Sequence, residues 1–102
     1  MSRADVFQDI INERSRQTAK FGDQKARPMG QWFAVLGEEF GEAAHDANEI
    51  REVKTDVEVG QHVTGLRREL IQVAAVAVAM IERLDDEAQN RRTLFRLVER
   101  EV

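Results

Sequence analysis

Three glutamates lie close together in the segment LGEEFGEA, which runs from Leu36 to Ala43. Apolar residues flank them at spacings of three and four, and this periodicity is typical of an amphipathic helix. Residues three apart on a helix share a face, so Glu39 and Glu42 point the same way, and Glu38 is displaced from Glu39 by about 100°. The segment therefore predicts a pair of carboxylates beside the apolar stripe of a helix.

A second polar pair repeats this spacing about one helix further on. Glu69 and Gln72 lie near the start of a strongly apolar segment, LRRELIQVAAVAVAMIERL, which runs from Leu66 to Leu84. If the two helices pack antiparallel, the two pairs converge on one small volume. Carboxylate and amide oxygens are the ligands that Mg²⁺, Mn²⁺ and Ca²⁺ prefer, and such an ion would offset the repulsion between the acids.

The alternative for these acids is an ordinary solvated helix face, which charged runs on helices usually form. Two features favour a metal site instead. Glu39 and Glu42 border an apolar stripe, and Glu69 precedes a helix too hydrophobic for its first turns to be freely exposed. Carboxylates at the edge of buried surface need a partner.

Composition places the chain among soluble globular proteins. It has 102 residues, of which 42% are hydrophobic and 33% charged, and this size predicts a single domain over residues 1–102. The net charge of -4 argues against nucleic-acid binding. The absence of cysteine excludes disulfides and cysteine-based zinc sites.

Nothing in the sequence indicates a membrane role. The N-terminal segment MSRADVFQDI lacks the apolar core of a signal peptide. The apolar run from Leu70 to Ile81 is too short to span a bilayer. We therefore expect a cytoplasmic protein.

The hydrophobic periodicity predicts an all-α fold, an antiparallel helical bundle. We expect helices over residues 4–20, 31–53, 64–83 and 85–102, joined by connections at 21–30 and 54–62. Residues 4–84 would form the core and 85–102 a helical tail. The third helix is apolar nearly all round, so we expect a homodimer or homotetramer to complete its burial. Gly37 and Gly41 suggest either close helix packing or room for a ligand.

The first connection and its neighbours gather hydrogen-bond donors and positive charge. Lys20, Gln24 and Lys25 lie just before Trp32, the only tryptophan. For Trp32, a core-packing role at the helix start is at least as good an interpretation as a role in binding a ligand, because tryptophan is usually largely buried.

These motifs resemble the MazG-like nucleotide pyrophosphohydrolases of the all-α NTP pyrophosphatase superfamily. The family pattern is EExxE followed, on the next long helix, by ExxD. Here EEFGE from Glu38 to Glu42 matches the first part outright, and ELIQ from Glu69 to Gln72 matches the second incompletely. The strings RQTAKFGDQ and ELIQVAAVAVAMIE also look like small bacterial and phage members, so the likeness covers about residues 12–84.

The resemblance implies magnesium-dependent hydrolysis of a nucleoside triphosphate between the α and β phosphates, releasing a monophosphate and pyrophosphate. It also implies roles for individual residues. Glu39, Glu42, Glu69 and Gln72 would be ligands of Mg²⁺, with Mn²⁺ as a second candidate, and Glu38 would be catalytic, assisting the ion or orienting the attacking water. The residues implied to bind substrate are Lys20, Gln24 and Lys25, through phosphate contacts, and Trp32, by stacking on the base.

Gln72 departs from the family pattern, which has aspartate at this position. An amide oxygen can ligate magnesium but carries no charge, so the change should weaken metal binding. Two alternatives to an active enzyme therefore stay open. One is a catalytically weak or inactive nucleotide-binding or regulatory module of the same fold, and the other is a purely structural helical oligomer.

Overall fold

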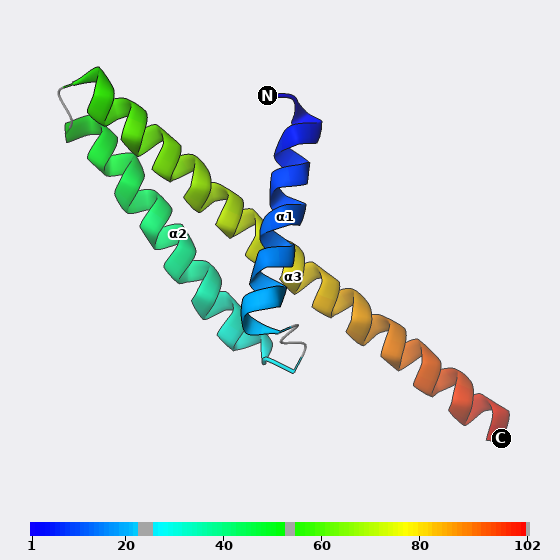
Figure 1. Cartoon of the computed structure of the whole chain (residues 1–102). Coiled ribbons are helices and arrows are strands. Elements are labelled where there is room, and N and C mark those ends of the chain that lie inside the picture. The colour runs from blue at the N-terminus through cyan, green and yellow to red at the C-terminus, as the bar shows by residue number, and fades with distance from the viewer. Residues whose placement is uncertain (23–25, 53–54, 102) are drawn as a thin grey trace.

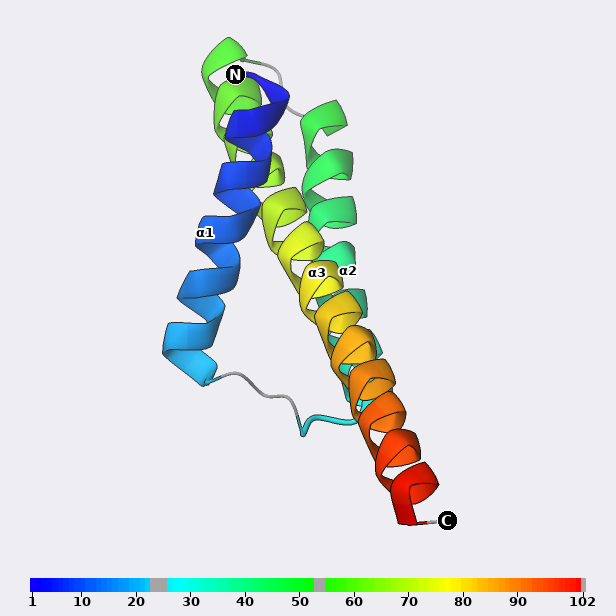
Figure 2. The same cartoon turned by 90° about the vertical axis from the view of Figure 1, so that its right-hand side faces the viewer.

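The computed structural model describes residues 1–22, 26–52 and 55–101. These residues form three helices and no strand, namely α1 (Arg3–Phe21), α2 (Met29–Glu52) and α3 (Asp56–Glu101). The predicted all-α class is thus confirmed for this part of the chain. α2 and α3 form an antiparallel pair, and α1 crosses α3 at a steep angle (Figures 1 and 2).

Local signals explain both ends of α1. At its start, the Ser2 hydroxyl accepts a hydrogen bond from the backbone N–H of Asp5, and the Asp5 carboxylate accepts one from the backbone N–H of Ser2. This reciprocal arrangement is a capping box. At the other end, Gly22 has a φ of 76° and its N–H donates to the carbonyl of Thr18 at 2.8 Å. Glycine adopts this conformation without the steric penalty that a Cβ would bring.

α3 is longer than the sequence predicted. Residues 56–62, expected in a connection, are helical, and no break separates the expected third and fourth helices near residue 85. Thr55 accounts for the early start, because its hydroxyl accepts a hydrogen bond from the backbone N–H of Glu58. Near residue 85, where we expected a break between two helices, an ion pair of 3.1 Å between Arg83 and Glu87 links successive turns of the helix. Gly60 and the acidic pair Asp85 and Asp86 are of residue types that are frequent at helix boundaries, but here they lie within one continuous helix.

The core lies between α2 and α3 and is small. Trp32 packs there with Val76, Ala79 and Met80, and each of these four residues is at most 6% exposed. Apart from the backbone of α2 itself and the adjacent residues, no atom of the described residues lies within 4 Å of the position that a Cβ would take at Gly37 or Gly41. The interpretation of these glycines as sites of close helix packing is therefore wrong for the described part of a single chain.

Much apolar surface stays exposed. The large hydrophobic residues on the surface of α3 alone are Val57, Val63, Leu70, Ile81, Leu84, Leu94, Phe95, Leu97 and Val98. The last part of α3 extends beyond the other two helices, and the chain measures 71 Å along its longest axis (Figure 1). None of the helices in the described ranges combines the length and the hydropathy that a membrane crossing requires.

Candidate metal centre

Three of the predicted ligands converge where α2 faces α3. One carboxylate oxygen from each of Glu39, Glu42 and Glu69 lies within 4.8 Å of the other two. The helical spacing of three places Glu39 and Glu42 on the same face of α2, and the antiparallel packing brings Glu69 of α3 opposite them. Glu38 lies outside this group and is exposed, in a surface hollow that Glu42 and Glu69 also line.

Gln72 joins this cluster through its side-chain amide. With the NH₂ group turned toward the acids, as its surroundings require, it donates to Glu39 Oε2 and to Glu69 Oε2, both at 3.0 Å. In this orientation Gln72 holds together two carboxylates that would otherwise repel each other. The amide oxygen is then the atom that points away from the acids. Gln72 is thus part of the cluster as predicted, but here as a hydrogen-bond donor.

The electrostatics of the cluster favour protonation. The pKa of Glu69 is raised to about 6, first by partial burial and then by a hydrogen bond to Glu42 and by the charges of Glu42, Glu39 and Asp46. Burial also raises the pKa of Glu39, and the charges of Glu42, Glu13 and Glu38 contribute to that rise. Carboxyl groups crowded in this way release repulsive energy when they bind a proton or a cation.

Two acids that sequence reasoning missed act on this cluster from its edges. Asp46, four residues after Glu42, lies on the same side of α2 and raises the pKa of Glu69. Its i,i+4 spacing from Glu42 was a signal that could have identified it. Glu13 comes from α1 and raises the pKa of Glu39. No local sequence pattern could predict this, because α1 reaches the cluster only through tertiary packing.

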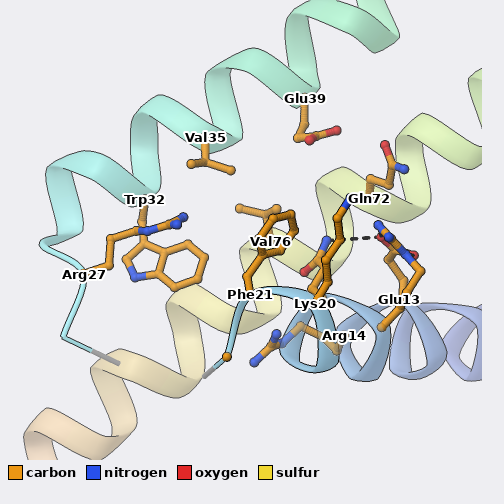
Figure 3. Close-up of a pocket in the computed structure, with 13 residues that line it drawn as sticks. Glu13, Arg14, Lys20, Phe21, Arg27, Trp32, Val35, Glu39, Gln72 and Val76 are labelled. Carbon is orange, nitrogen blue, oxygen red and sulfur yellow. Dashed lines mark hydrogen bonds and ion pairs between the residues drawn. The ribbon is translucent and has the colours of Figure 1, made fainter. Parts of the chain in front are cut away.

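A cavity of about 330 Å³ opens beside Glu39 and Gln72 (Figure 3). All three helices contribute to its walls, and Figure 3 shows Lys20 and Glu13 of α1 facing Glu39 of α2 and Gln72 of α3. The cavity combines cationic, apolar and acidic side chains. Its lining residues are Glu13, Arg14, Arg16, Gln17, Lys20, Phe21, Gly22, Arg27, Trp32, Val35, Glu39, Gln72 and Val76.

The residues predicted to bind substrate lie in different surroundings. Lys20 lines the cavity, with its ammonium group 5.1 Å from the centre of the Phe21 ring. Trp32 also lines the cavity, but it is a core residue at 6% exposure, and the guanidinium of Arg27 lies 4.8 Å from its ring centre. This placement agrees with the core-packing interpretation of Trp32. Gln24 and Lys25 lie outside the described residues.

Two arginines of α1 bring positive charge to the same cavity. Arg16 makes a two-pronged ion pair with Glu13, with nitrogen to oxygen distances of 2.8 and 2.6 Å. This pair lowers the pKa of Glu13, and the charge of Arg16 also partly offsets the rise in the pKa of Glu39. Arg14 pairs with Glu82 of α3 at 3.3 Å, which ties α1 to α3 beside the cavity. Neither arginine could be assigned to the site from the sequence, since its place there depends on where α1 crosses α3.

The three-glutamate cluster has suitable chemistry for a hard divalent cation. Magnesium binds oxygen ligands at about 2.0–2.1 Å in octahedral geometry, which requires neighbouring ligand oxygens about 3 Å apart. Side-chain rotations within the cluster can bring three oxygens from their present separations of up to 4.8 Å to such distances. The neighbouring cavity then offers room for a ligand that shares the ion.

Comparisons with protein-family models, with curated proteins and with solved structures gave no significant match for this chain. The residues of the cluster and the cavity beside it are therefore the features of this chain that indicate a function.

Proposed function

We propose that this chain is a magnesium-dependent nucleoside triphosphate pyrophosphohydrolase that releases a nucleoside monophosphate and pyrophosphate. The observation that carries the proposal is the convergence of Glu39, Glu42 and Glu69 next to a cavity whose lining includes a lysine and three arginines. A polyphosphate has the opposite charge to these four side chains, and its oxygens can share a cation with carboxylates. Mn²⁺ is a second candidate for the ion.

In this proposal Glu39, Glu42 and Glu69 hold the cation, which when bound would neutralise phosphate charge and lower the pKa of a ligated water. Glu38, exposed beside Glu42 and Glu69, orients the attacking water. Lys20 and the arginines of the cavity bind phosphate oxygens. Gln72 keeps Glu39 and Glu69 in place through its two hydrogen bonds and so acts as a positioning residue.

The second candidate is a nucleotide-binding or regulatory module of the same fold with weak or no catalysis. The position of Gln72 favours it, because a neutral amide already links two of the carboxylates that a metal would link. A cation must compete with these hydrogen bonds for Glu39 and Glu69. Because of this competition, the site should bind a metal ion more weakly than it would with an acidic residue at position 72.

Self-association belongs to the same proposal. Only six apolar residues are buried in the described part of the chain, and large apolar side chains of all three helices are exposed. A homodimer or homotetramer in which other copies cover these surfaces would complete the antiparallel bundle. We place this assembly in the cytoplasm.

The two candidates are separated by measuring binding and turnover on one sample. Calorimetry with magnesium and a panel of nucleoside triphosphates reports binding, and a pyrophosphate-release assay on the same mixtures reports chemistry. The hydrolase predicts binding together with pyrophosphate release that chelation of magnesium abolishes. Binding without release from any member of the panel would refute the hydrolase and support the module.

A further inference from the structure

The C-terminal part of α3 projects alone from the rest of the molecule (Figures 1 and 2). The ion pair between Arg14 and Glu82 and the packing of Trp32 with Met80 both lie near its beginning. Beyond them, the large apolar side chains Leu84, Leu94, Phe95, Leu97 and Val98 are 52–64% exposed. A helix with so many exposed apolar side chains needs a covering surface.

Part of this apolar surface follows the repeat of a two-stranded coiled coil. The residues at alternating spacings of three and four are Ile81, Leu84, Ala88, Arg91, Phe95 and Val98. An average spacing of 3.5 residues keeps one seam of a helix facing a partner helix over its whole length. We call these six residues the tail seam. The large apolar members of the seam are all exposed.

Charge divides this part of the helix into two blocks of opposite sign. Residues 82–87 contain four acids and one arginine, whereas residues 91–100 contain four arginines and one glutamate. A parallel pair of such helices would set acidic block beside acidic block and basic block beside basic block. An antiparallel pair sets each acidic block beside the basic block of the other helix, and this charge complementarity selects both the partner and its direction.

We infer that a second copy of this chain packs against the tail seam in antiparallel orientation. A two-fold axis between residues 89 and 90 matches the seam with itself. Ile81 then lies level with Val98 of the second copy, and Leu84 lies level with Phe95. Each of these residue pairs occurs twice in the interface, because a two-fold contact uses the same surface of both copies.

The central layers agree with this register. Ala88 lies level with Arg91 of the second copy, and the small alanine leaves room for the apolar stem of the arginine while its guanidinium reaches solvent. Next to the seam, Asp85 of each copy faces Arg92 of the other. A parallel pair would instead place Arg91 against Arg91 in the seam. This interface is separate from the proposed metal centre, so the two can be tested independently.

Cysteine cross-linking tests the direction directly, because the chain has no cysteine of its own. Full-length Leu84→Cys and Phe95→Cys proteins are mixed and oxidised. The antiparallel pair predicts a disulfide between the two variants and none within either, since copies of the same position lie about 16 Å apart along the axis at 1.5 Å per residue. A mixture of Asn90→Cys and Thr93→Cys, both off the seam, gives the collisional background.

Two outcomes would overturn the inference. Disulfides that form mainly within each single variant would indicate a parallel pair. Cross-linking no greater than in the Asn90→Cys and Thr93→Cys control would show that two copies do not pack together along the tail seam. A heterodisulfide well above that control supports the antiparallel pair.

Charge reversal provides a second test with the same cross-link as readout. Asp85→Arg alone and Arg92→Asp alone should each lower the yield of the heterodisulfide about fivefold, because two facing pairs change from attraction to repulsion. The double variant Asp85→Arg/Arg92→Asp should restore it. In a parallel pair, Asp85 would face no charged residue next to the seam. Two results would therefore refute the antiparallel register: an unchanged yield of the heterodisulfide with Asp85→Arg, or a double variant that does not restore this yield.

Discussion

Replacing Gln72 by glutamate tests the cluster most sharply, because the two side chains have nearly the same shape. The amide of Gln72 donates to Glu39 Oε2 and Glu69 Oε2 at 3.0 Å each. A glutamate cannot donate when it is ionised, and it adds a further negative charge beside two others. The substitution therefore removes two attractive contacts and introduces repulsion in the metal-free protein.

Hydrogen bonds to charged groups contribute about 1.5–3 kcal/mol each when buried, and we use about 1 kcal/mol each here because the cluster is partly exposed. Gln72→Glu should therefore lower the free energy of unfolding of the metal-free protein by about 2 kcal/mol. For a domain of this size that corresponds to a decrease in Tm of about 10 °C. The additional carboxylate should also tighten magnesium binding about tenfold, a change of about 1.4 kcal/mol in binding free energy.

The assay is thermal unfolding at pH 7.5 with chelator and with a magnesium series, at one fixed protein concentration because assembly also affects Tm. Gln61→Glu adds the same charge at an exposed position of α3 and serves as the matched control. Gln72→Glu should unfold earlier than Gln61→Glu in chelator and should gain more from magnesium. Equal melting temperatures and equal magnesium responses would contradict the placement of Gln72 between the two acids.

Three other perturbations follow from the structure. Because the fold raises the pKa of Glu69 from 4.5 to about 6, the contribution of this carboxyl group to stability is complete below pH 4.5 and is lost as pH rises through about 6. The raised pKa of Glu39 adds a loss of stability in the same direction. Melts in chelator should show this loss, and a flat profile from pH 4.5 to 7.5 would contradict it. Glu69→Gln should raise Tm in chelator, but it should abolish the increase in Tm that magnesium gives the native protein. If the chain were a purely structural oligomer, the variant would instead be more stable than the native protein both with and without magnesium. Gly22→Ala should lower the free energy of unfolding by about 1 kcal/mol, because its φ of 76° is unfavourable for a residue with a Cβ. Gly37→Ala should raise the free energy of unfolding by up to about 1 kcal/mol, because no described atom outside the helix's own backbone and the adjacent residues lies within 4 Å of the added Cβ. Equal changes in chemical denaturation would contradict a positive φ at residue 22 and an open helical position at residue 37.

The convergence of Glu39, Glu42 and Glu69 could be predicted from the sequence because helical periodicity fixes which side chains share a face. Their spacing of three residues places Glu39 beside Glu42. The packing of the apolar stripe of α2 against that of α3 then brings Glu69 opposite these two residues. The role of Gln72 as donor could not be predicted, because an amide offers both a donor and an acceptor and its orientation depends on the atoms around it.

The parts that sequence reasoning missed depend on tertiary packing. Glu13 and Arg16 belong to the site only because α1 crosses α3 at that level, and no local signal sets a crossing point. The continuity of α3 was missed for a different reason. Gly60 and the acids at 85 and 86 are frequent at helix boundaries, but each costs so little inside a helix that neighbouring contacts decide the outcome.

The most direct test of the proposed activity is a ³¹P NMR time course of nucleoside triphosphates incubated with the purified protein and magnesium. The proposal predicts signals of a nucleoside monophosphate and pyrophosphate, and their loss in the Glu69→Gln variant. A diphosphate with inorganic phosphate as products, equal rates in the Glu69→Gln variant, or no hydrolysis of a nucleotide that calorimetry shows to bind would contradict it.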